Sequence, residues 1–261
     1  MKNILVTGAS GFIAKHLLPE LYKKNYKVKK ITRKDGNIQD AITWKKLPKY
    51  DVVIHLSGRT FVPDSWKNPS EFIDTNVNGV IQALNYCKKN NSKLIYISSY
   101  LYGNAQKIPI SERERVKVTN PYTLSKKLAE DVCECYYKNF GVNILILRPF
   151  NVFGPNQKEH FLIPSIMKQI LLSKKITVND LNPKRDFVYI KDLVDAIIKT
   201  INLKKKFEIF NIASGKSYSV REVIKIIQEV KDMKLKIKSS KKKRKDEIMD
   251  TKANITKSRK I

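Results

Sequence analysis

Tyr122 and Lys126 carry the sharpest chemistry in this sequence, four positions apart in the segment NPYTLSK at residues 120–126. Asn120 is a favoured helix N-cap and Pro121 suits the first helical position, so we expect a helix to begin here. The i, i+4 spacing then places the tyrosine and the lysine on one helix face. An ammonium favours a neighbouring phenolate, so we expect the Tyr122 pKa to lie below its ordinary value of about 10 and to suit proton exchange. An exposed Tyr–Lys pair without a chemical role would show the same spacing.

A serine is expected beside this tyrosine. The apolar run at residues 94–97 predicts a strand that ends at Ser98 and Ser99. Open α/β sheets bind their ligands beyond the carboxyl ends of the strands. A serine hydroxyl there could hold a substrate carbonyl or hydroxyl next to Tyr122, whereas a serine in a simple turn would have no such role.

A glycine-rich turn predicts where a cofactor binds. An apolar run at residues 3–7 leads into TGASGFIA at residues 7–14. The glycines leave room for backbone amides to approach a diphosphate, and the N-terminus of the following helix also attracts anions. Placed directly after an N-terminal strand, the turn is typical of a dinucleotide site. The cofactor contacts expected here are Gly8, Ser10, Gly11, Phe12 and Ile13.

The end of the second predicted strand indicates which dinucleotide is bound. A dinucleotide fold usually ends this strand with a carboxylate that bonds the adenosine ribose hydroxyls. Residues 31–34 read Ile-Thr-Arg-Lys instead, with cations and without a carboxylate. Because Arg33 and Lys34 would attract a 2′-phosphate, we expect NADP(H) over NAD(H). Lysines scattered along the chain could also place cations here by chance.

Strands and helices alternate along the first part of the chain. Strands are expected at residues 3–7, 28–32, 52–56, 94–98 and 143–147, and helices at 12–21, 72–87 and 122–137. This alternation predicts an α/β fold, a doubly wound, Rossmann-like parallel sheet. After Arg148, Pro and Gly residues interrupt the pattern, and the expected helices lie at 161–172, 193–201 and 220–230. We therefore expect a dinucleotide-binding domain at 1–150 and a smaller, interleaved α/β substrate-binding region at 151–261.

Composition narrows the class of protein. The chain has 261 residues, 42% of them hydrophobic, with 52 Lys and Arg against 24 Asp and Glu and a net charge of +28. This suits one large globular domain, alone or with a small appendage. No apolar run has the length of a membrane span, so we expect a soluble cytoplasmic protein with no membrane partner.

The excess of basic residues has two interpretations. Only nine of the 52 are Arg and the lysines are scattered through every segment, so we expect a solvated surface and no nucleic-acid partner. The dense basic cluster at residues 241–245 could bind an anion or be a charged loop. The cysteines at 87, 133 and 135 lack metal-ligand spacing, so we expect three buried thiols and no metal site.

Seven motifs, in this order, resemble those of the extended short-chain dehydrogenase/reductase family, the NAD(P)-dependent nucleotide-sugar epimerases, dehydratases and ketoreductases. The resemblance covers nearly the whole chain. The motifs are the glycine turn, HLSG at 55–58, NVNG at 76–79, the strand end at Ser98, the Tyr122/Lys126 pair, RPFNVFGP at 148–155 and RDFVY at 185–189.

The resemblance implies a mechanism. Tyr122 would exchange a proton with a sugar hydroxyl or ketone while a hydride passes between substrate carbon and nicotinamide. Lys126 would bond the nicotinamide ribose, and Ser98 would orient the reacting oxygen, with Ser99 as the alternative. The further cofactor contacts implied are Arg33, Asn37, Ile38, Leu56, Ser57, Gly58, Asn76, Tyr122, Lys126 and Pro149. The substrate contacts implied are Ser99, Asn151, Arg185 and Arg244, of which the two arginines would grip a diphosphate.

Departures from the family pattern narrow the reaction. Dehydratases of the family carry an Asp-Glu pair after the catalytic Ser or Thr, whereas this chain has Ser99-Tyr100, so dehydration is not expected. The cations at 33 and 34 favour an NADPH-dependent 4-ketoreductase acting on a nucleoside-diphosphate 4-keto-6-deoxysugar. A nucleotide-sugar 4-epimerase that retains NAD is the alternative. From a different class comes a non-catalytic NADP-binding regulator.

Two further expectations follow from the resemblance. The helix that carries the tyrosine and lysine often pairs with its twofold mate, and Leu128, Val132, Cys135 and Tyr136 add apolar surface to it. A homodimer is expected on that ground, although the same side chains could pack inside the monomer. Family members commonly continue for several dozen residues beyond the segment at 254–257, so we expect the substrate region to be naturally short or incomplete.

Overall fold

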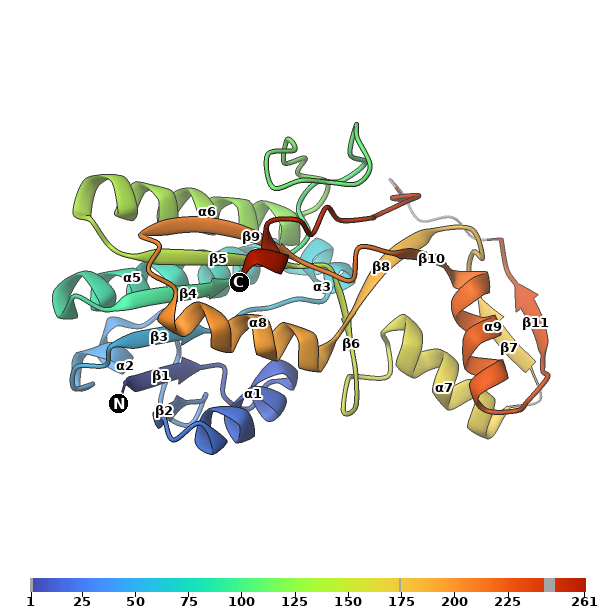
Figure 1. Ribbon diagram of the computed structural model, residues 1–261, viewed down its shortest axis with the longest axis horizontal. Coiled ribbons are helices and arrows are strands. Elements are labelled where there is room, and N and C mark those ends of the chain that lie inside the picture. The colour runs from blue at the N-terminus through green and yellow to red at the C-terminus, as the bar shows by residue number, and fades with distance from the viewer. Residues whose placement is uncertain (1, 174, 242–246) are drawn as a thin grey trace.

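The computed structural model describes residues 2–173, 175–241 and 247–261. Its central sheet confirms the doubly wound, Rossmann-like architecture (Figure 1). The sheet is parallel throughout, in the order β2 (Lys27–Ile31), β1 (Asn3–Thr7), β3 (Val52–His55), β4 (Lys93–Ile97), β5 (Ile144–Pro149) and β9 (Phe207–Ile212). The chain passes from β1 to one side and later returns to its other side, which makes the carboxyl ends of β1 and β3 the crevice where such sheets bind ligands.

Helices cover both faces of this sheet (Figure 1). α1 (Phe12–Lys23) and α8 (Ile190–Asn202) bury apolar side chains on one face, and α5 (Gly79–Asn90) and α6 (Pro121–Phe140) do so on the other. The central strands β3 and β5 are buried at every residue, as expected of parallel strands covered on both sides.

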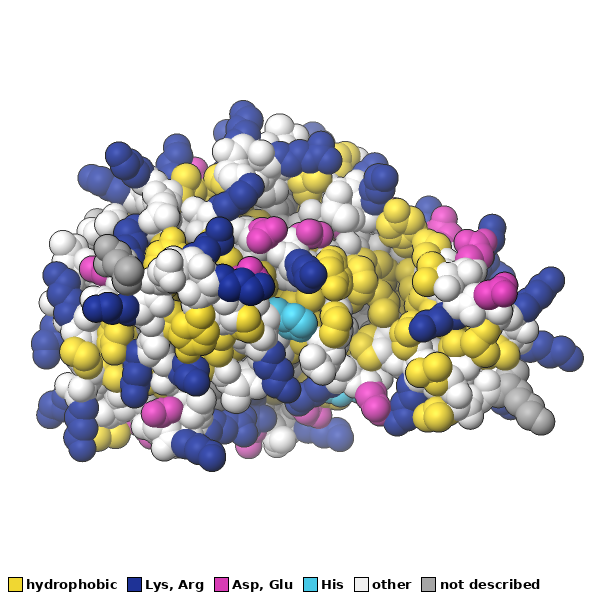
Figure 2. All heavy atoms as spheres, turned by 60° about the horizontal axis from the view of Figure 1, so that its bottom comes forward, with side chains coloured by type: hydrophobic (Ala, Val, Ile, Leu, Met, Phe, Trp, Pro, Cys, Tyr) yellow, Lys and Arg dark blue, Asp and Glu magenta, His cyan; other side chains and the backbone are white. Residues whose placement is uncertain are grey.

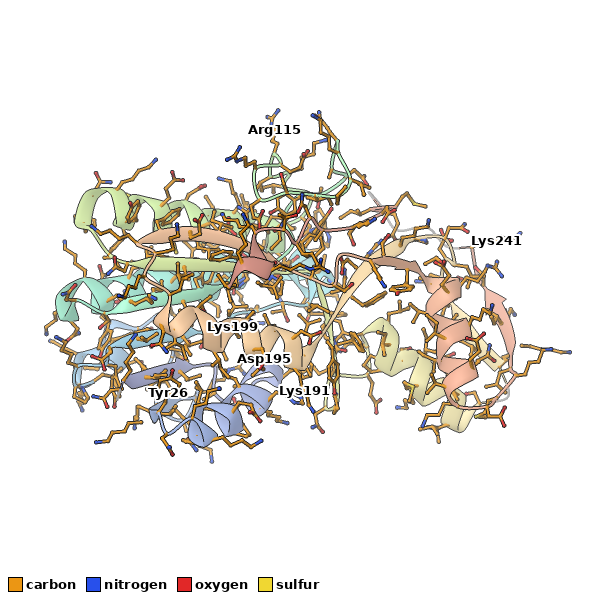
Figure 3. The ribbon with its side chains drawn as sticks, in the orientation of Figure 1. Tyr26, Arg115, Lys191, Asp195, Lys199 and Lys241 are labelled. Atoms are coloured by element: carbon orange, nitrogen blue, oxygen red, sulfur yellow. The ribbon has the colours of Figure 1, made fainter. Side chains whose placement is uncertain are left out.

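The spacing of apolar and charged residues in α8 determines which face of the helix packs on the sheet. Its apolar residues recur at helical spacing and pack on the sheet, whereas Lys191, Asp195 and Lys199 project from the opposite, exposed side (Figure 3). Removal of the apolar stripe from water drives this docking.

β2 is the edge strand on its side of the sheet. The chain leaves β2 through a loop and α2 (Ala41–Lys45) and goes straight to β3. Its residues KVKKI are mostly exposed apart from Ile31. Lysines on an exposed edge strand discourage pairing with other chains.

A smaller lobe lies at one end of the sheet (Figure 1). β6 (Asn151–Phe153), β8 (Lys184–Tyr189) and β10 (Ser217–Ser219) form one sheet, and β7 (Lys175–Val178) pairs with β11 (Lys236–Ser239). α7 (Leu162–Leu172) and α9 (Val220–Val230) share an apolar cluster beside them. Between these elements the chain returns to the large sheet as α8 and β9, so the lobe is not continuous in sequence.

Some elements differ from the sequence prediction. The helix expected at 72–87 is divided into α4 (Pro69–Ile73), the π-helical turn η1 (Asp74–Asn78) and α5. The short helices α2, α3 (Val62–Lys67) and η2 (Ser258–Lys260) were not predicted. None of the described helices combines the length and apolarity needed to cross a membrane. Basic side chains are spread over the face shown in Figure 2, with acidic ones between them.

Candidate active site

The first turn of α6 is built around its cap. The Asn120 side chain accepts a hydrogen bond from the Thr123 backbone N–H at 2.9 Å, and the Thr123 hydroxyl accepts one from the Asn120 N–H at 3.1 Å. Pro121 is the first helical residue, so the predicted helix start is confirmed. This capping box sets the phase of the helix. Tyr122 and Lys126 consequently share the buried face, 8% and 4% exposed.

Tyr122 is a buried phenol with a raised pKa. Burial raises the pKa to about 12, and a hydrogen bond with the Ser99 hydroxyl opposes part of that rise. The expected lowering of this pKa is therefore wrong for this structure. The Lys126 ammonium donates instead to the Ile97 carbonyl oxygen at 2.9 Å. Phe72 packs edge-on against the phenol ring, with 6.3 Å between centroids, and excludes water that would stabilise a phenolate.

Lys126 is a buried ammonium. Burial lowers its pKa to about 8, and the nearby Glu130 and Cys133 oppose part of that fall. An amine with this pKa is still mostly charged at neutral pH. It can therefore donate hydrogen bonds to a ribose and act on the phenol electrostatically.

The two serines after β4 have different environments. The Ser99 hydroxyl contacts the Tyr122 phenol. The Ser98 hydroxyl oxygen is buried and has no hydrogen-bond partner among the described residues. The neighbours of Ser98 on either side contact Lys126 and Tyr122, so this serine lies at the same site. An unpaired buried hydroxyl calls for a physical explanation, and at this position an oxygen of a bound substrate would provide the partner.

The glycine turn forms the cradle expected of a diphosphate site. Gly8 has φ +65°, and a Cβ there would lie 2.8 Å from the Ser57 backbone nitrogen, so only glycine fits between these segments. The N-terminus of α1 follows at Gly11, with no side-chain cap and no acidic residue in the first turn. Its N–H groups are therefore available to an anion. The residues present, together with the Ser98 oxygen, fit a nicotinamide dinucleotide.

The predicted cofactor residues gather around this cradle from several elements. Ser10 and Gly11 are exposed at the turn, and Phe12 and Ile13 begin α1. Leu56, Ser57 and Gly58 follow β3, and Pro149 ends β5. A Cβ on Gly58 would lie 2.9 Å from the Asn76 side-chain oxygen and 3.5 Å from Lys126 Nζ, which places the turn against the lysine.

Asn76 holds that turn in place. Its side-chain oxygen accepts from the Arg59 N–H at 2.8 Å, and its amide donates to the Arg59 carbonyl at 3.1 Å and to the Ser125 hydroxyl at 2.8 Å. The residue is buried inside the π-helical turn η1. Its side chain thus joins the loop after β3 to α6.

The loop after β2 corrects one inference from the sequence. Arg33 and Asn37 are exposed there, while Ile38 is buried. The loop does contain a carboxylate: Asp35 turns back and accepts hydrogen bonds from the Thr32 N–H and hydroxyl, each at 2.9 Å. These bonds lower the Asp35 pKa. The absence of an acidic group inferred from residues 31–34 is therefore wrong for the folded loop.

The substrate side of the site is less open than the motifs suggest. Asn151 donates to the Asp186 carbonyl at 3.3 Å. Arg185 donates to the Ile248 carbonyl at 2.6 Å and pairs with Glu247 at 2.5 Å. The guanidinium expected to grip a diphosphate is thus neutralised within the chain. Arg244, the second arginine implied by the family pattern, lies outside the described residues.

A buried ion pair anchors this region. Arg148 donates to Glu130 at 3.0 and 2.5 Å and to the Tyr102 hydroxyl at 2.8 Å. The Tyr102 hydroxyl in turn donates to the Asn211 side-chain oxygen at 2.6 Å. The network joins α6, the end of β5, the loop after β4 and β9. The sequence interpretation missed its acidic member, although Glu130 lies one helical turn after Lys126 in the sequence.

The cysteines correct a smaller expectation. Cys87 and Cys133 are buried, but Cys135 is exposed. Cys135 follows Cys133 by two residues on the same helix, so the two side chains lie on nearly opposite faces. Among the described residues no group of three His, Cys, Asp or Glu side chains could hold a metal ion.

Comparisons with known proteins identify the family to which this chain is similar. A sequence model of the NAD dependent epimerase/dehydratase family matches residues 4–213. GDP-6-deoxy-D-mannose reductase of Pseudomonas aeruginosa is 31% identical over 252 residues, which is 90% of this chain and 82% of the relative. A putative UDP-glucose 4-epimerase of Methanocaldococcus jannaschii is also 31% identical, over 86% of this chain and 81% of its own length.

A solved structure agrees with the fold. RMD from Pseudomonas aeruginosa complexed with NADPH superimposes with a TM-score of 0.90 at 27% identity, covering 100% of this chain and 92% of the other. The family match spans the glycine cradle, the serine strand end and the Tyr–Lys helix. The chain belongs to the NAD dependent epimerase/dehydratase family, whose members are nucleotide-sugar reductases, epimerases and dehydratases that use NAD(P).

Proposed function

We propose that this protein is an NADPH-dependent 4-ketoreductase that reduces a nucleoside-diphosphate 4-keto-6-deoxysugar. The observation that carries the proposal is the buried Tyr122 phenol in contact with Ser99 at the end of β4, where the neighbouring Ser98 oxygen is unpaired among the described residues. The relative named GDP-6-deoxy-D-mannose reductase supports this direction of reaction. Residues 99 and 100 are Ser and Tyr, without the acidic pair that water elimination requires.

The proposed roles follow from charge and position. When bound, the dinucleotide supplies the hydride that reduces the ketone carbon. Ser98 donates a hydrogen bond to the ketone oxygen and Tyr122 gives it a proton. The Lys126 ammonium bonds the nicotinamide ribose and stabilises the phenolate that remains. Gly8 and the N-terminus of α1 bind the diphosphate of the dinucleotide.

Cofactor choice is assigned to the loop after β2. Arg33 is exposed there and is free to meet a 2′-phosphate, and the relative complexed with NADPH supports NADP. Asp35 opposes this, because an ionised carboxylate repels a phosphate and can bond ribose hydroxyls. Arg33→Asp should move the ratio of dissociation constants toward NAD(H), whereas an unchanged ratio would refute the role of Arg33.

A 4-epimerase with retained NAD is the second candidate. The Asp35 carboxylate at the end of β2 favours it, and so does the 31% identity to a putative UDP-glucose 4-epimerase. The two candidates differ in stoichiometry. A reductase consumes one NADPH for each ketone, while an epimerase returns its dinucleotide unchanged.

The deciding experiment incubates the protein with NADPH and GDP- or dTDP-4-keto-6-deoxysugars. We expect stoichiometric loss of NADPH absorbance and a product two mass units heavier. Tyr122→Phe is the matched control, because it removes one oxygen, keeps the ring that packs against Phe72 and should keep NADPH binding while it loses turnover. Turnover by this variant would contradict the proposed chemistry.

We also propose a homodimer through α6. Leu128 and Cys135 are exposed on this helix, while Val132 and Tyr136 pack partly against the core. Sedimentation of the wild type and of Leu128→Glu tests this, since a charge in a dimer face should give monomers.

A further inference from the structure

The surroundings of the Lys126 ammonium raise the question of what holds it. Its nitrogen donates to the Ile97 carbonyl at 2.9 Å and lies 4.9 Å from the centroid of the Tyr96 ring. Tyr96 is fully buried on β4 and Lys126 is 4% exposed. An ammonium has three donors, so a single carbonyl leaves much of its lost hydration unreplaced.

Among the charged and titratable neighbours, Glu130 and Cys133 oppose only part of the fall that burial causes in the Lys126 pKa. Glu130, on the same helix, is occupied by its two bonds to Arg148. His55 on β3 is fully buried and burial lowers its pKa to about 3, so the ring is neutral. Burial also raises the pKa of the Cys133 thiol well above its ordinary value. Besides the Ile97 carbonyl at 2.9 Å, the face of the Tyr96 ring, with its centroid 4.9 Å from the ammonium, is a source of negative potential on the sheet.

We propose, on the basis of the function above, that Tyr96 is a positioning residue whose ring face holds the Lys126 ammonium where it can reach the dinucleotide ribose and Tyr122. Cation–π attraction is strongest when both partners are removed from water, as they are here. The ring lies on the sheet, and its strand carries the Ile97 carbonyl and leads to Ser98. The strand β4 would therefore fix the positions of both Lys126 and Ser98.

The ring, and not its hydroxyl, is assigned this role. The Tyr96 hydroxyl is buried with no hydrogen-bond partner among the described residues. An unpaired buried hydroxyl destabilises a protein. Tyr96→Phe should therefore keep the lysine in place and cost no stability.

The test varies the ring while it preserves shape. Phenylalanine and its mono-, di- and trifluorinated forms are incorporated at position 96, because each fluorine weakens the negative face of the ring. The first readout is the pH dependence of NADPH binding, followed by fluorescence, and the second is kcat against pH for the ketone. Trifluorophenylalanine at Phe207, a partly buried ring that stacks on Tyr137 at 4.9 Å, controls for fluorination of an aromatic ring elsewhere in the same sheet. Thermal unfolding verifies the fold of each variant.

The sign follows from which charge state the ring favours. It stabilises the ammonium, so a weaker ring lowers the Lys126 pKa from its value of about 8. The high-pH loss of NADPH binding and of kcat should shift stepwise to lower pH with each fluorine. At pH 8 the trifluorinated protein should have lost roughly tenfold in kcat.

Each outcome is decisive. A fluorine series that leaves the pH profiles unchanged, or a Tyr96→Phe variant whose pH profiles match those of the trifluorinated protein, would overturn the proposed role of the ring face. A wild type that binds NADPH but reduces no ketone would refute the proposed reductase while the binding series still tests the ring. A wild type that binds no dinucleotide would overturn both.

Discussion

Glu130→Gln tests the buried ion pair beneath the site. The Glu130 and Arg148 side chains are 5% and 6% exposed, and their closest oxygen–nitrogen distance is 2.5 Å. Glutamine has nearly the same shape as glutamate, so the substitution removes the charge and leaves the packing. The guanidinium would then remain buried with the Tyr102 hydroxyl and a neutral amide as its partners.

The expected magnitude is large because the second charge stays behind. Removing one partner of a buried pair costs about 3–5 kcal/mol of the free energy of unfolding. In a domain of this size 1 kcal/mol shifts the unfolding midpoint by about 2–4 °C. Glu130→Gln should therefore lower the midpoint by roughly 6–20 °C, toward the small end because the amide still accepts a hydrogen bond.

Calorimetric unfolding midpoints of three variants separate the effect of the buried ion pair from that of losing any glutamate. Glu134→Gln is the control, since this glutamate is on the same helix and pairs with Lys138 at the surface, with side chains 48% and 64% exposed; its midpoint should not move measurably. Glu130→Leu combined with Arg148→Met should recover most of the loss, because apolar groups replace both charges. A Glu130→Gln midpoint within about 2 °C of the wild type would refute the reasoning.

Three further substitutions test the site itself. Ser98→Ala should lower kcat by about 10²-fold without lowering stability, because the hydroxyl lost is unpaired in the folded protein; a destabilised variant would contradict that assignment. Gly8→Ala forces a Cβ at φ +65° to within 2.8 Å of the Ser57 nitrogen, which should strain the turn by about 1–3 kcal/mol. Titration with the dinucleotide should therefore show binding weakened at least tenfold. Glu247→Gln should free Arg185 and tighten binding of GDP or UDP about tenfold in titration calorimetry, and weaker binding would show that the pair preorganises the arginine.

The large sheet could be predicted because its signals are local. Four of the five strands predicted for it contain continuous apolar runs, and α6 has both its cap residue and its proline in sequence. The lysine-rich β2 was predicted from its alternation with helices, and β9 was not predicted. The smaller lobe could not be predicted to the same extent. β6 and β10 are three residues each and pair with β8 from opposite directions in the chain, so no local pattern marks them.

The chemistry of the site shows a different limit. Spacing predicted correctly that Tyr122 and Lys126 share a helix face, but it carried no information on burial, and burial decided the direction of the Tyr122 pKa. Likewise residues 31–34 include no acidic residue, yet the hydrogen bond from the Thr32 N–H to Asp35 brings this carboxylate back to the end of the strand. Tertiary contacts determine both the desolvation of a group and the neighbours of a loop.

The raised pKa bears on the direction of the reaction. A phenol with a pKa of about 12 is protonated at neutral pH and can give its proton to a ketone oxygen, whereas removal of a proton from a sugar hydroxyl requires the phenolate first. The reduced nicotinamide ring is uncharged, so its presence would leave the phenol protonated, while the oxidised ring carries a positive charge that favours the phenolate. Reduction therefore starts from the protonation state that the folded chain already holds. Its kcat/KM should fall as pH rises through the Lys126 pKa of about 8, and a rate that rose through the same range would instead indicate a site that starts by removing a proton.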